Sequence, residues 1–297
     1  MTPIHPAAFR SGPPPWDAEA APGRAGAIAP DARPNLTDVD LRQLREIAAT
    51  ATHRITNVAT SLGLAVLKRR REPRGGWRDR IVQLLARLVS LPLLGPVPSH
   101  GGDRGQDVEV QRLRTLHAAG LPVPAVLHAE PGFFVMQRLD GGNLVQVIER
   151  GGPEARAAWQ RGLESLLAVH ACDQALSHAF ARNFIVTPTR LAMIDFEGDP
   201  VETLSLAEAE ARDWLLYLHS TVWQLRHDDV AELRADLDAA LGRESAAVRK
   251  LVLAAGKRLA WLRHLPGERR PWGREVVGAQ ALAQLFHSAP APSASSS

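Results

Sequence analysis

Cysteine is almost absent from this chain of 297 residues, in which Cys172 is the single one. One thiol can form neither an intramolecular disulfide nor a thiolate metal site, so both are excluded within one chain. Long apolar runs are missing too: no stretch of about 18 uninterrupted apolar residues is present, and no membrane-spanning helix is expected. The N-terminus lacks a basic segment followed by an apolar one, which predicts a cytoplasmic protein.

Signatures of hydrolases and of nucleic-acid-binding proteins are also missing. The histidines show neither H-x-x-x-H nor H-E-x-x-H spacing, and no G-x-S-x-G is present, so zinc peptidases and serine hydrolases are not indicated. A basic cluster at 68–80 contains one aromatic residue, Trp77, and no nucleic-acid partner is expected. The formal net charge of +3 and the pI near 9.6 are compatible with phosphate-rich or membrane-surface partners.

The two ends of the chain have the composition of disordered segments. Residues 1–36 are rich in Pro, Ala and Gly without a hydrophobic period, and residues 288–297 form a similarly loose tail. Order is predicted to begin at Thr37, which can cap a helix whose leucine and isoleucine residues share one face.

Strand signals are concentrated in the first half of the chain. The segments HRITNVAT and LAVLKRR flank SLG, which predicts a strand–turn–strand unit, and GFFVMQRLDGGNLVQVIE predicts a buried strand, a turn and a short helix. Between them a helix is expected to end at Gly120, before a Pro-Val-Pro that cannot continue it. Helical patterns dominate afterwards, at 154–170, 203–225, 229–241, 245–263 and 275–287. The sequence therefore predicts an α+β fold, with a strand-bearing lobe at 37–139 and a helical lobe at 140–287.

An Arg-rich insertion occupies about residues 69–104. Within it, residues 77–94 carry an apolar helical stripe surrounded by arginines. One interpretation is an interfacial helix on anionic lipid. The other, which we favour, is a helix that packs against the rest of the domain and exposes a solvated basic face.

Four polar or charged residues and one Gly-rich turn follow one another along the chain in a recognisable order. Lys68 ends a predicted strand, Glu109 lies on the next helix, a Gly-rich turn follows an extended segment at 133–142, and Asn183 and Asp195 flank a small hairpin in LSHAFARNFIVTPTRLAMIDFEGDP. This order resembles the protein-kinase-like superfamily, nearest to its bacterial lipopolysaccharide (Kdo) kinase and aminoglycoside phosphotransferase branches, over roughly residues 50–225. The resemblance implies a two-lobed fold, with a reduced β-rich small lobe and a mainly helical large lobe.

The same resemblance implies ATP as a substrate and gives the residues roles. Lys68 holds phosphate oxygens and Glu109 orients Lys68, while Asp213, in AEARDWLLYL, resembles a buried helix aspartate that braces the catalytic loop. Asn183 and Asp195 can meet at one Mg²⁺ or Mn²⁺ ion, because the ends of a hairpin are close together and hard cations prefer oxygen ligands.

The sequence departs from the family at two places. The catalytic aspartate is expected five residues before Asn183, where this chain has His178 in LSHAFARN instead of HGDLHPGN. A histidine can accept a proton at neutral pH, so His178 is the candidate base. Between His53 and Lys68 a single glycine, Gly63, stands where a phosphate-covering G-x-G-x-x-G is expected.

Each candidate residue also has an ordinary structural interpretation. Lys68 begins Lys-Arg-Arg-Arg and can be one solvated cation among several. Glu109 can form a surface pair with Arg112, and Asp107 competes with it for the contact to Lys68. His178 can be a hydrogen-bonding loop residue.

Arg182, next to Asn183, has two interpretations of its own. It can contact phosphate, or it can pair with Asp195 or Asp199.

The sequence thus predicts an ATP-dependent phosphotransferase in the cytoplasm. Its acceptor is expected to be a membrane-associated lipid-linked sugar or a small molecule, and in the interfacial interpretation residues 77–94 contact anionic lipid at the inner face of the membrane. The first alternative is a pseudokinase scaffold that regulates a partner, for which the missing aspartate and the missing glycine loop argue. The second is a peripheral membrane adaptor that works through 77–94 alone.

Overall fold

The computed structural model describes residues 35–70, 92–95, 101–176 and 178–288, which have a mixed α+β fold. The predicted disordered ends and most of the Arg-rich insertion, including nearly all of 77–94, lie outside these residues. Among the described residues, no helix combines the length and the apolar character needed to cross a membrane.

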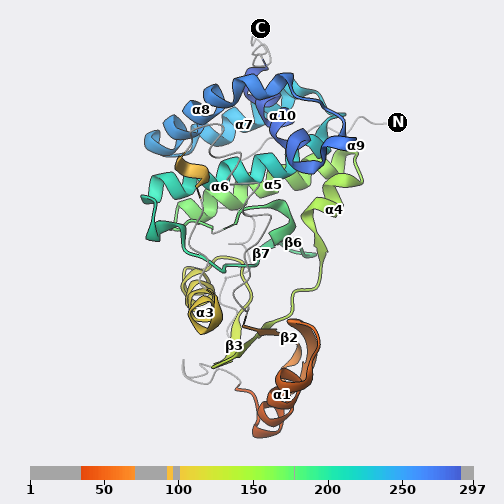
Figure 1. Ribbon diagram of the computed structural model, residues 1–297, viewed down its shortest axis with the longest axis vertical. Coiled ribbons are helices and arrows are strands. Elements are labelled where there is room, and N and C mark those ends of the chain that lie inside the picture. The colour runs from red at the N-terminus through yellow and green to blue at the C-terminus, as the bar shows by residue number, and fades with distance from the viewer. Residues whose placement is uncertain (1–34, 71–91, 96–100, 177, 289–297) are drawn as a thin grey trace, which may run out of the picture. The chain divides into compact units, whose positions relative to one another are not determined.

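The chain first forms a helix and an antiparallel sheet of four strands in the order β1-β2-β4-β3 (Figure 1). Helix α1 (Asp38–Thr50) begins as predicted at Thr37, because Thr37 and Asp40 cap each other in a capping box. The strands are β1 (Ile55–Thr60), β2 (Gly63–Arg69), β3 (Val126–Glu130) and β4 (Phe133–Gln137).

The predicted hairpin of β1 and β2 is confirmed, and its turn contains Gly63 at a φ of +104°. That conformation is readily adopted only by glycine, which explains the residue at this turn. In the register of the sheet, Lys68 lies opposite Ile55 on one side and Phe134 on the other. A small apolar core, with Leu44, Leu67 and Val135 at its centre, joins α1 to the sheet.

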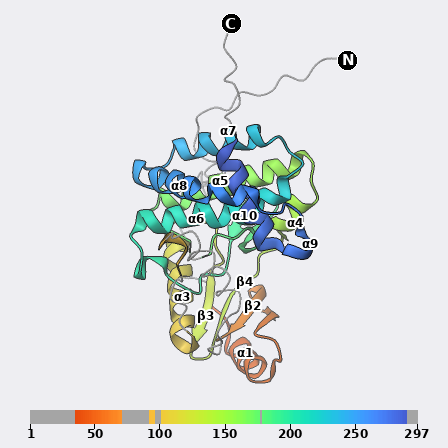
Figure 2. The same ribbon diagram turned by 45° about the horizontal axis from the view of Figure 1, so that its top comes forward.

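Helix α3 (Gly102–Ala118) lies beside β3 and β4, as Figures 1 and 2 both show. It ends just before Gly120, as predicted, and Gly120 has a φ of +77°. Gln106 ties the helix to the sheet, because its Nε2 atom donates to the carbonyl groups of Glu130 and Phe133. The buried face of α3 also carries Glu109, which thereby points toward β2.

A second, three-stranded antiparallel sheet leads into the helical part of the chain. It contains β5 (Gly142–Asn143), β6 (Phe184–Val186) and β7 (Leu191–Met193) in that order. Asn143 ends β5 and caps α4 (Leu144–Glu149) by accepting from the amide of Val145. The predicted hairpin between Asn183 and Asp195 is therefore confirmed as β6 and β7.

Helices make up the remainder, and the five helical segments predicted there are confirmed. The helices are α5 (Pro153–His170), α6 (Leu206–Thr221), α7 (Val230–Gly242), α8 (Ala246–Leu259), α9 (Arg269–Trp272) and α10 (Arg274–His287), with 3-10 helices η2 (Pro92–Leu94), η3 (Ala181–Asn183), η4 (Pro200–Glu202), η5 (Val222–Leu225) and η6 (Ala260–His264). Strands β3 and β5 and helix α9 were not predicted.

Helices α5 and α6 pack closely through a glycine (Figure 1). A Cβ atom on Gly162 would lie 1.9 Å from the hydroxyl of Tyr217, which is fully buried and donates to the carbonyl of Trp159. The close approach brings the C-terminal end of α5 to the middle of α6, which positions His170 near Asp213.

Candidate functional site

Lys68 is a buried lysine surrounded by three carboxylates. Its side chain is 3% exposed, and its Nζ atom lies 2.6 Å from Glu109 Oε1, 3.0 Å from Asp195 Oδ1 and 3.2 Å from Glu197 Oε1. An ammonium taken out of water needs such partners, because an isolated buried charge is strongly unfavourable. The three carboxylates come from α3 and from the segment after β7, so Lys68 links three parts of the chain.

The structure excludes the ordinary interpretations of Lys68 and Glu109. Lys68 is not a solvated cation, and Glu109 is buried and in contact with Lys68. Arg112 turns away from Glu109 and donates to the side chain of Gln174 and the carbonyl of Ala175. Asp107 is exposed on α3. Of the two acidic residues considered for this contact, Glu109 is the one that makes it.

Charge at this cluster favours the ionised lysine. Burial acts to lower the pKa of Lys68, but the charges of Glu109, Asp195 and Glu197 outweigh burial and raise it. For Glu197, burial acts to raise the pKa, and the opposing charges of Lys68 and Arg54 bring it down to about 2. Lys68 and Glu197 are therefore both charged at neutral pH.

The β6–β7 hairpin brings Asn183, Asp195 and His178 to the rim of one hollow. The amide of Ile194 donates to the carbonyl of Asn183 at 2.9 Å, which joins the two ends of the hairpin directly before Asp195. The hollow is narrow: about 170 Å³ of space lies between its atoms, open solvent included. Its other lining residues are Leu176, Phe184, Met193, Ile194 and Phe196.

Asp195 has the geometry of a functional carboxylate. Its backbone φ is +73°, a region that residues other than glycine seldom occupy and that is enriched at functional sites. Its side chain is 40% exposed, although its neighbour Phe196 is buried. One oxygen contacts Lys68, and the carboxylate is open to solvent.

Asn183 and His178 are linked to each other. The Nδ2 atom of Asn183 donates to the backbone carbonyl of His178 at 2.8 Å, which leaves the amide oxygen as the ligand atom for a cation. Burial lowers the pKa of the His178 imidazole, and Asp195 acts in the opposite direction. A neutral imidazole at the rim of the hollow is able to accept a proton.

Arg182, next to Asn183, contacts an aromatic ring. Its guanidinium lies over the ring of Phe180, 4.2 Å from the centroid, and Phe180 in turn stacks on His178. Asp199 accepts from the amide of Val201 and so caps η4.

A sealed network lies beneath the segment that carries His178. Asp213 on α6 is completely buried and accepts from the amide of Leu176, two residues before His178. His170 bridges the network, with Nε2 3.5 Å from Asp213 Oδ2 and Nδ1 2.6 Å from Glu244 Oε1. Trp214 Nε1 also donates to Glu244, at 2.8 Å. The contact to Leu176 is a bracing contact of the kind that the resemblance implies for Asp213.

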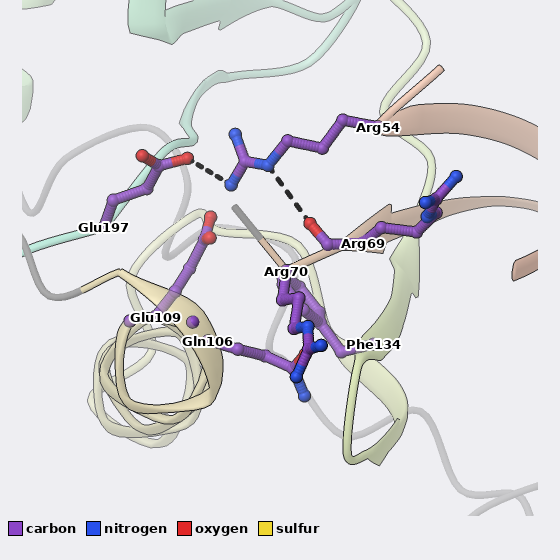
Figure 3. A pocket seen from close by; sticks show the side chains of 9 residues that line it. Arg54, Arg69, Arg70, Gln106, Glu109, Phe134 and Glu197 are labelled. Atoms are coloured by element: carbon purple, nitrogen blue, oxygen red, sulfur yellow. Dashed lines mark hydrogen bonds and ion pairs between the residues drawn. The ribbon is translucent and has the colours of Figure 1, made fainter. Parts of the chain in front are cut away.

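Two residues of the Lys68 cluster were not predicted. Arg54, directly before β1, contacts Glu197 at 2.5 Å and donates from Nε to the carbonyl of Arg69 at 3.1 Å (Figure 3). Arg54 and Glu197 line a second narrow hollow, where about 260 Å³ of space lies between the atoms, open solvent included; the other lining residues are Arg69, Arg70, Gly102, Gly105, Gln106, Glu109 and Phe134. Glu197 is the last residue of the Asp-Phe-Glu motif. Its position two residues after Asp195 is the feature of the sequence that could have indicated its place in the cluster.

The donor set fits a divalent cation that is shared with phosphate. The described residues contain no cluster of three or more His, Cys, Asp or Glu side chains arranged to hold a metal. Magnesium, however, is commonly held by one or two carboxylates, with water and phosphate oxygens completing its shell. The carboxylate of Asp195 and the amide oxygen of Asn183 at one hollow meet that smaller requirement.

Comparison with known proteins adds no relative. The sequence matches no family model and no curated protein.

Proposed function

We propose that this chain is an ATP-dependent phosphotransferase with a two-lobed, protein-kinase-like fold. The observation that carries the proposal is the buried Lys68, which contacts both Glu109 on α3 and Asp195 after β7. A buried lysine oriented by a helix glutamate, next to a half-exposed aspartate, is the arrangement with which kinases hold a triphosphate and its metal. Burial of Lys68 and Glu109 strengthens the interaction of the lysine with phosphate.

Each residue of the site has its own role in the proposed reaction. Lys68 holds phosphate oxygens, Glu109 keeps Lys68 in place, and Asn183 and Asp195 hold Mg²⁺ or Mn²⁺. The bound cation supplies charge neutralisation for the transferred phosphoryl group. His178, neutral because of its burial, accepts the proton of the attacking hydroxyl group. Asp213 fixes the backbone before His178, which keeps the imidazole at the rim of the hollow.

The acceptor is a hydroxyl group on a small molecule or on a lipid-linked sugar. We place the reaction in the cytoplasm, with peripheral attachment at the inner face of the membrane. The segment that would make the attachment, 77–94, lies outside the described residues except for its last three.

The test is transfer of labelled γ-phosphate from ATP, with Mg²⁺ or Mn²⁺ and a membrane extract as the source of acceptor. Wild type, Asp195→Asn and His178→Ala are compared, each shown to be folded by its thermal unfolding. We expect a labelled product with wild type alone. Removal of one electrostatic contact to the transition state slows a reaction by about a hundredfold or more, so both variants should fall to background.

A pseudokinase scaffold is the second candidate, and one observation favours it. The position of the catalytic aspartate holds His178, and the cationic Lys68 is already engaged by three carboxylates of its own chain. Folded wild-type protein that transfers no label above the Asp195→Asn background would favour the scaffold. The scaffold also predicts that His178→Ala leaves biological function intact.

A further inference from the structure

Glu197 lies between two cations of its own chain. Its Oε1 atom is 2.5 Å from Arg54 Nη2 and 3.2 Å from Lys68 Nζ. An oxygen that accepts from a guanidinium and from an ammonium has the contacts that a phosphate oxygen makes in a phosphate site. The side chain of Glu197 is 15% exposed, so these contacts are shielded from solvent to a large extent.

Arg54 is fixed beside Lys68 by the backbone of two strands. It directly precedes β1, whose first residue, Ile55, lies opposite Lys68 in the sheet. Its carbonyl accepts from the amide of Arg69 at 2.8 Å, and its Nε atom donates to the carbonyl of Arg69 at 3.1 Å. Both the backbone and the guanidinium are therefore tied to β2, and the Nη2 atom points toward Glu197 (Figure 3).

The charge of Glu197 competes with that of an incoming phosphate. Lys68 and Arg54 both contact its Oε1 atom, and the carboxylate repels a triphosphate that approaches these two cations while it stays in place. When the Glu197 carboxylate leaves, both cations regain free donors for another anion.

Glu197 is also placed where its side chain can move. It lies in the segment between β7 and η4, where the following residue, Gly198, forms an isolated β-bridge, whereas Glu109 is fixed on the buried face of α3. Movement of Glu197 therefore does not require a secondary-structure element to shift.

We propose that Arg54 and Lys68 form a phosphoryl-binding site, and that Glu197 fills it as an internal anion until a phosphoryl group displaces it. The inference rests on the proposed phosphotransferase function and assigns a ligand and a competitor within that site. Arg54 covers the phosphates in a chain that has no glycine-rich loop, since Gly63 is the single glycine between His53 and Lys68. A nucleotide therefore binds to Arg54 and Lys68 only when Glu197 has moved away from them.

The experiment is calorimetric titration of four proteins with inorganic tripolyphosphate and, separately, with ATP, each with and without Mg²⁺. The proteins are wild type, Glu197→Gln, Arg54→Gln and the control Arg45→Gln. Arg45 forms an exposed pair with Glu130, so its variant removes one arginine charge and one ion pair away from the cluster. Thermal unfolding shows which proteins are folded, and Arg54→Lys replaces Arg54→Gln if the latter is not.

We expect Glu197→Gln to bind metal-free tripolyphosphate about tenfold more tightly than wild type, because the competing anion is removed. Arg54→Gln should bind it about tenfold more weakly, because a hydrogen bond between charged groups is lost. Arg45→Gln should equal wild type. ATP should follow the same order.

Several results would overturn the inference. Unchanged or weaker tripolyphosphate binding by Glu197→Gln would show that Glu197 is no competitor, and a loss confined to the Mg²⁺ titrations would make it a metal ligand instead. Equal binding by Arg54→Gln and Arg45→Gln would remove Arg54 from the site. ATP bound equally by all four proteins would overturn the inference and leave the proposed function standing. Tripolyphosphate that follows the expected order, with no ATP bound, would support the anion site and reject the proposed function.

Discussion

Two buried cations, Lys68 and His170, are each held by carboxylates, but their surroundings differ. The His170 network is sealed: the side chains of His170 and Glu244 are 4% exposed and that of Asp213 is completely buried. The Lys68 cluster is open on one side, where Asp195 reaches solvent. Similar charges therefore lie in one place that is closed to solvent and in another that is open to it at Asp195.

The difference separates structural from chemical roles. A sealed ion network fixes the backbone around it, and here Asp213 holds the amide of Leu176. An open cluster has carboxylate oxygens and cationic donors that can exchange their partners for a ligand. We therefore expect substitutions in the sealed network to change the free energy of unfolding, and substitutions at the open edge to change binding and activity.

The largest loss of stability is expected for Asp213→Asn. The substitution leaves the buried His170 cation with one carboxylate instead of two. Breaking a buried ion pair from one side costs about 3–5 kcal/mol. Urea unfolding, with Asp107→Asn on α3 as an exposed reference, measures the change. A loss equal to that of Asp107→Asn would contradict the assignment of Asp213 to a structural brace.

Lys68→Met should lower the free energy of unfolding by about 3 kcal/mol, because Glu109 is left buried without its cation. The double variant Lys68→Met/Glu109→Met should recover most of that loss, since an apolar pair of similar volume can replace a buried ion pair. Neither variant should transfer phosphate. Full recovery of transfer in the double variant would show that the pair serves stability alone.

Stability should fall between pH 6.5 and about 9. Asp213 and Glu244 outweigh the burial that acts to lower the pKa of His170, and raise it from 6.5 to about 9. The stabilisation is complete below the unfolded pKa and is lost as pH rises through the folded one, on the order of 3 kcal/mol. Glu210 faces the same network, and burial raises its pKa from 4.5 to about 7. Its ionisation therefore lowers the stability further as the pH rises from 4.5 to about 7.

Unfolding titrations at several pH values test this expectation, because they give the free energy of unfolding as a function of pH. His170→Gln should flatten the curve above pH 6.5, and Glu210→Gln should flatten it below pH 7. A curve for His170→Gln that runs parallel to that of wild type would contradict the protonated state of His170.

Gly162→Ala tests the helix contact that brings His170 to Asp213. The added Cβ would collide with the buried hydroxyl of Tyr217, and such overpacking costs about 2 kcal/mol. Gly242→Ala is the matched control, because a Cβ at Gly242, at the end of α7, meets nothing within 4 Å. Thermal unfolding of the two variants should differ clearly; equal melting temperatures would mean that α5 and α6 can separate without cost.

The smallest change in stability is expected for Asp195→Asn. Its half-exposed side chain limits the contribution of its ion pair to about 1 kcal/mol or less. Asparagine also tolerates the positive φ of this position. The variant should therefore unfold like wild type and yet fail in phosphate transfer. A loss of stability comparable to that of Asp213→Asn would contradict the distinction between a structural and a chemical cluster.

Local signals explain which parts of the fold could be predicted. The Thr37 capping box, the glycine at 120 and the hairpin between Asn183 and Asp195 act over a few residues, and each is readable from the sequence. Strand β3 was missed because all of its residues are half-buried, so no alternation marks it. The class of fold followed from these elements, whereas the two-lobed kinase arrangement stays a proposal.

The contacts of the candidate site also fall into those that could be predicted from the sequence and those that could not. Lys68 and Glu109 were paired through a family resemblance, and the structure places them in contact. The Arg54–Glu197 contact joins residues 143 positions apart, and the His170–Glu244 contact joins residues 74 positions apart. Contacts between residues so far apart in the chain produce no periodic pattern in the sequence. Such pairs become visible only when the fold is known.

The Asp213 brace also has a consequence for the order of synthesis on the ribosome. Lys68, Glu109, His178, Asn183 and Asp195 all precede Asp213, so a nascent chain contains the chemical residues before their support. The support is incomplete until Glu244 has emerged to join His170. A product truncated at the end of α7, before Glu244, would thus keep every residue of the candidate site and lack a partner of the network that holds it in position.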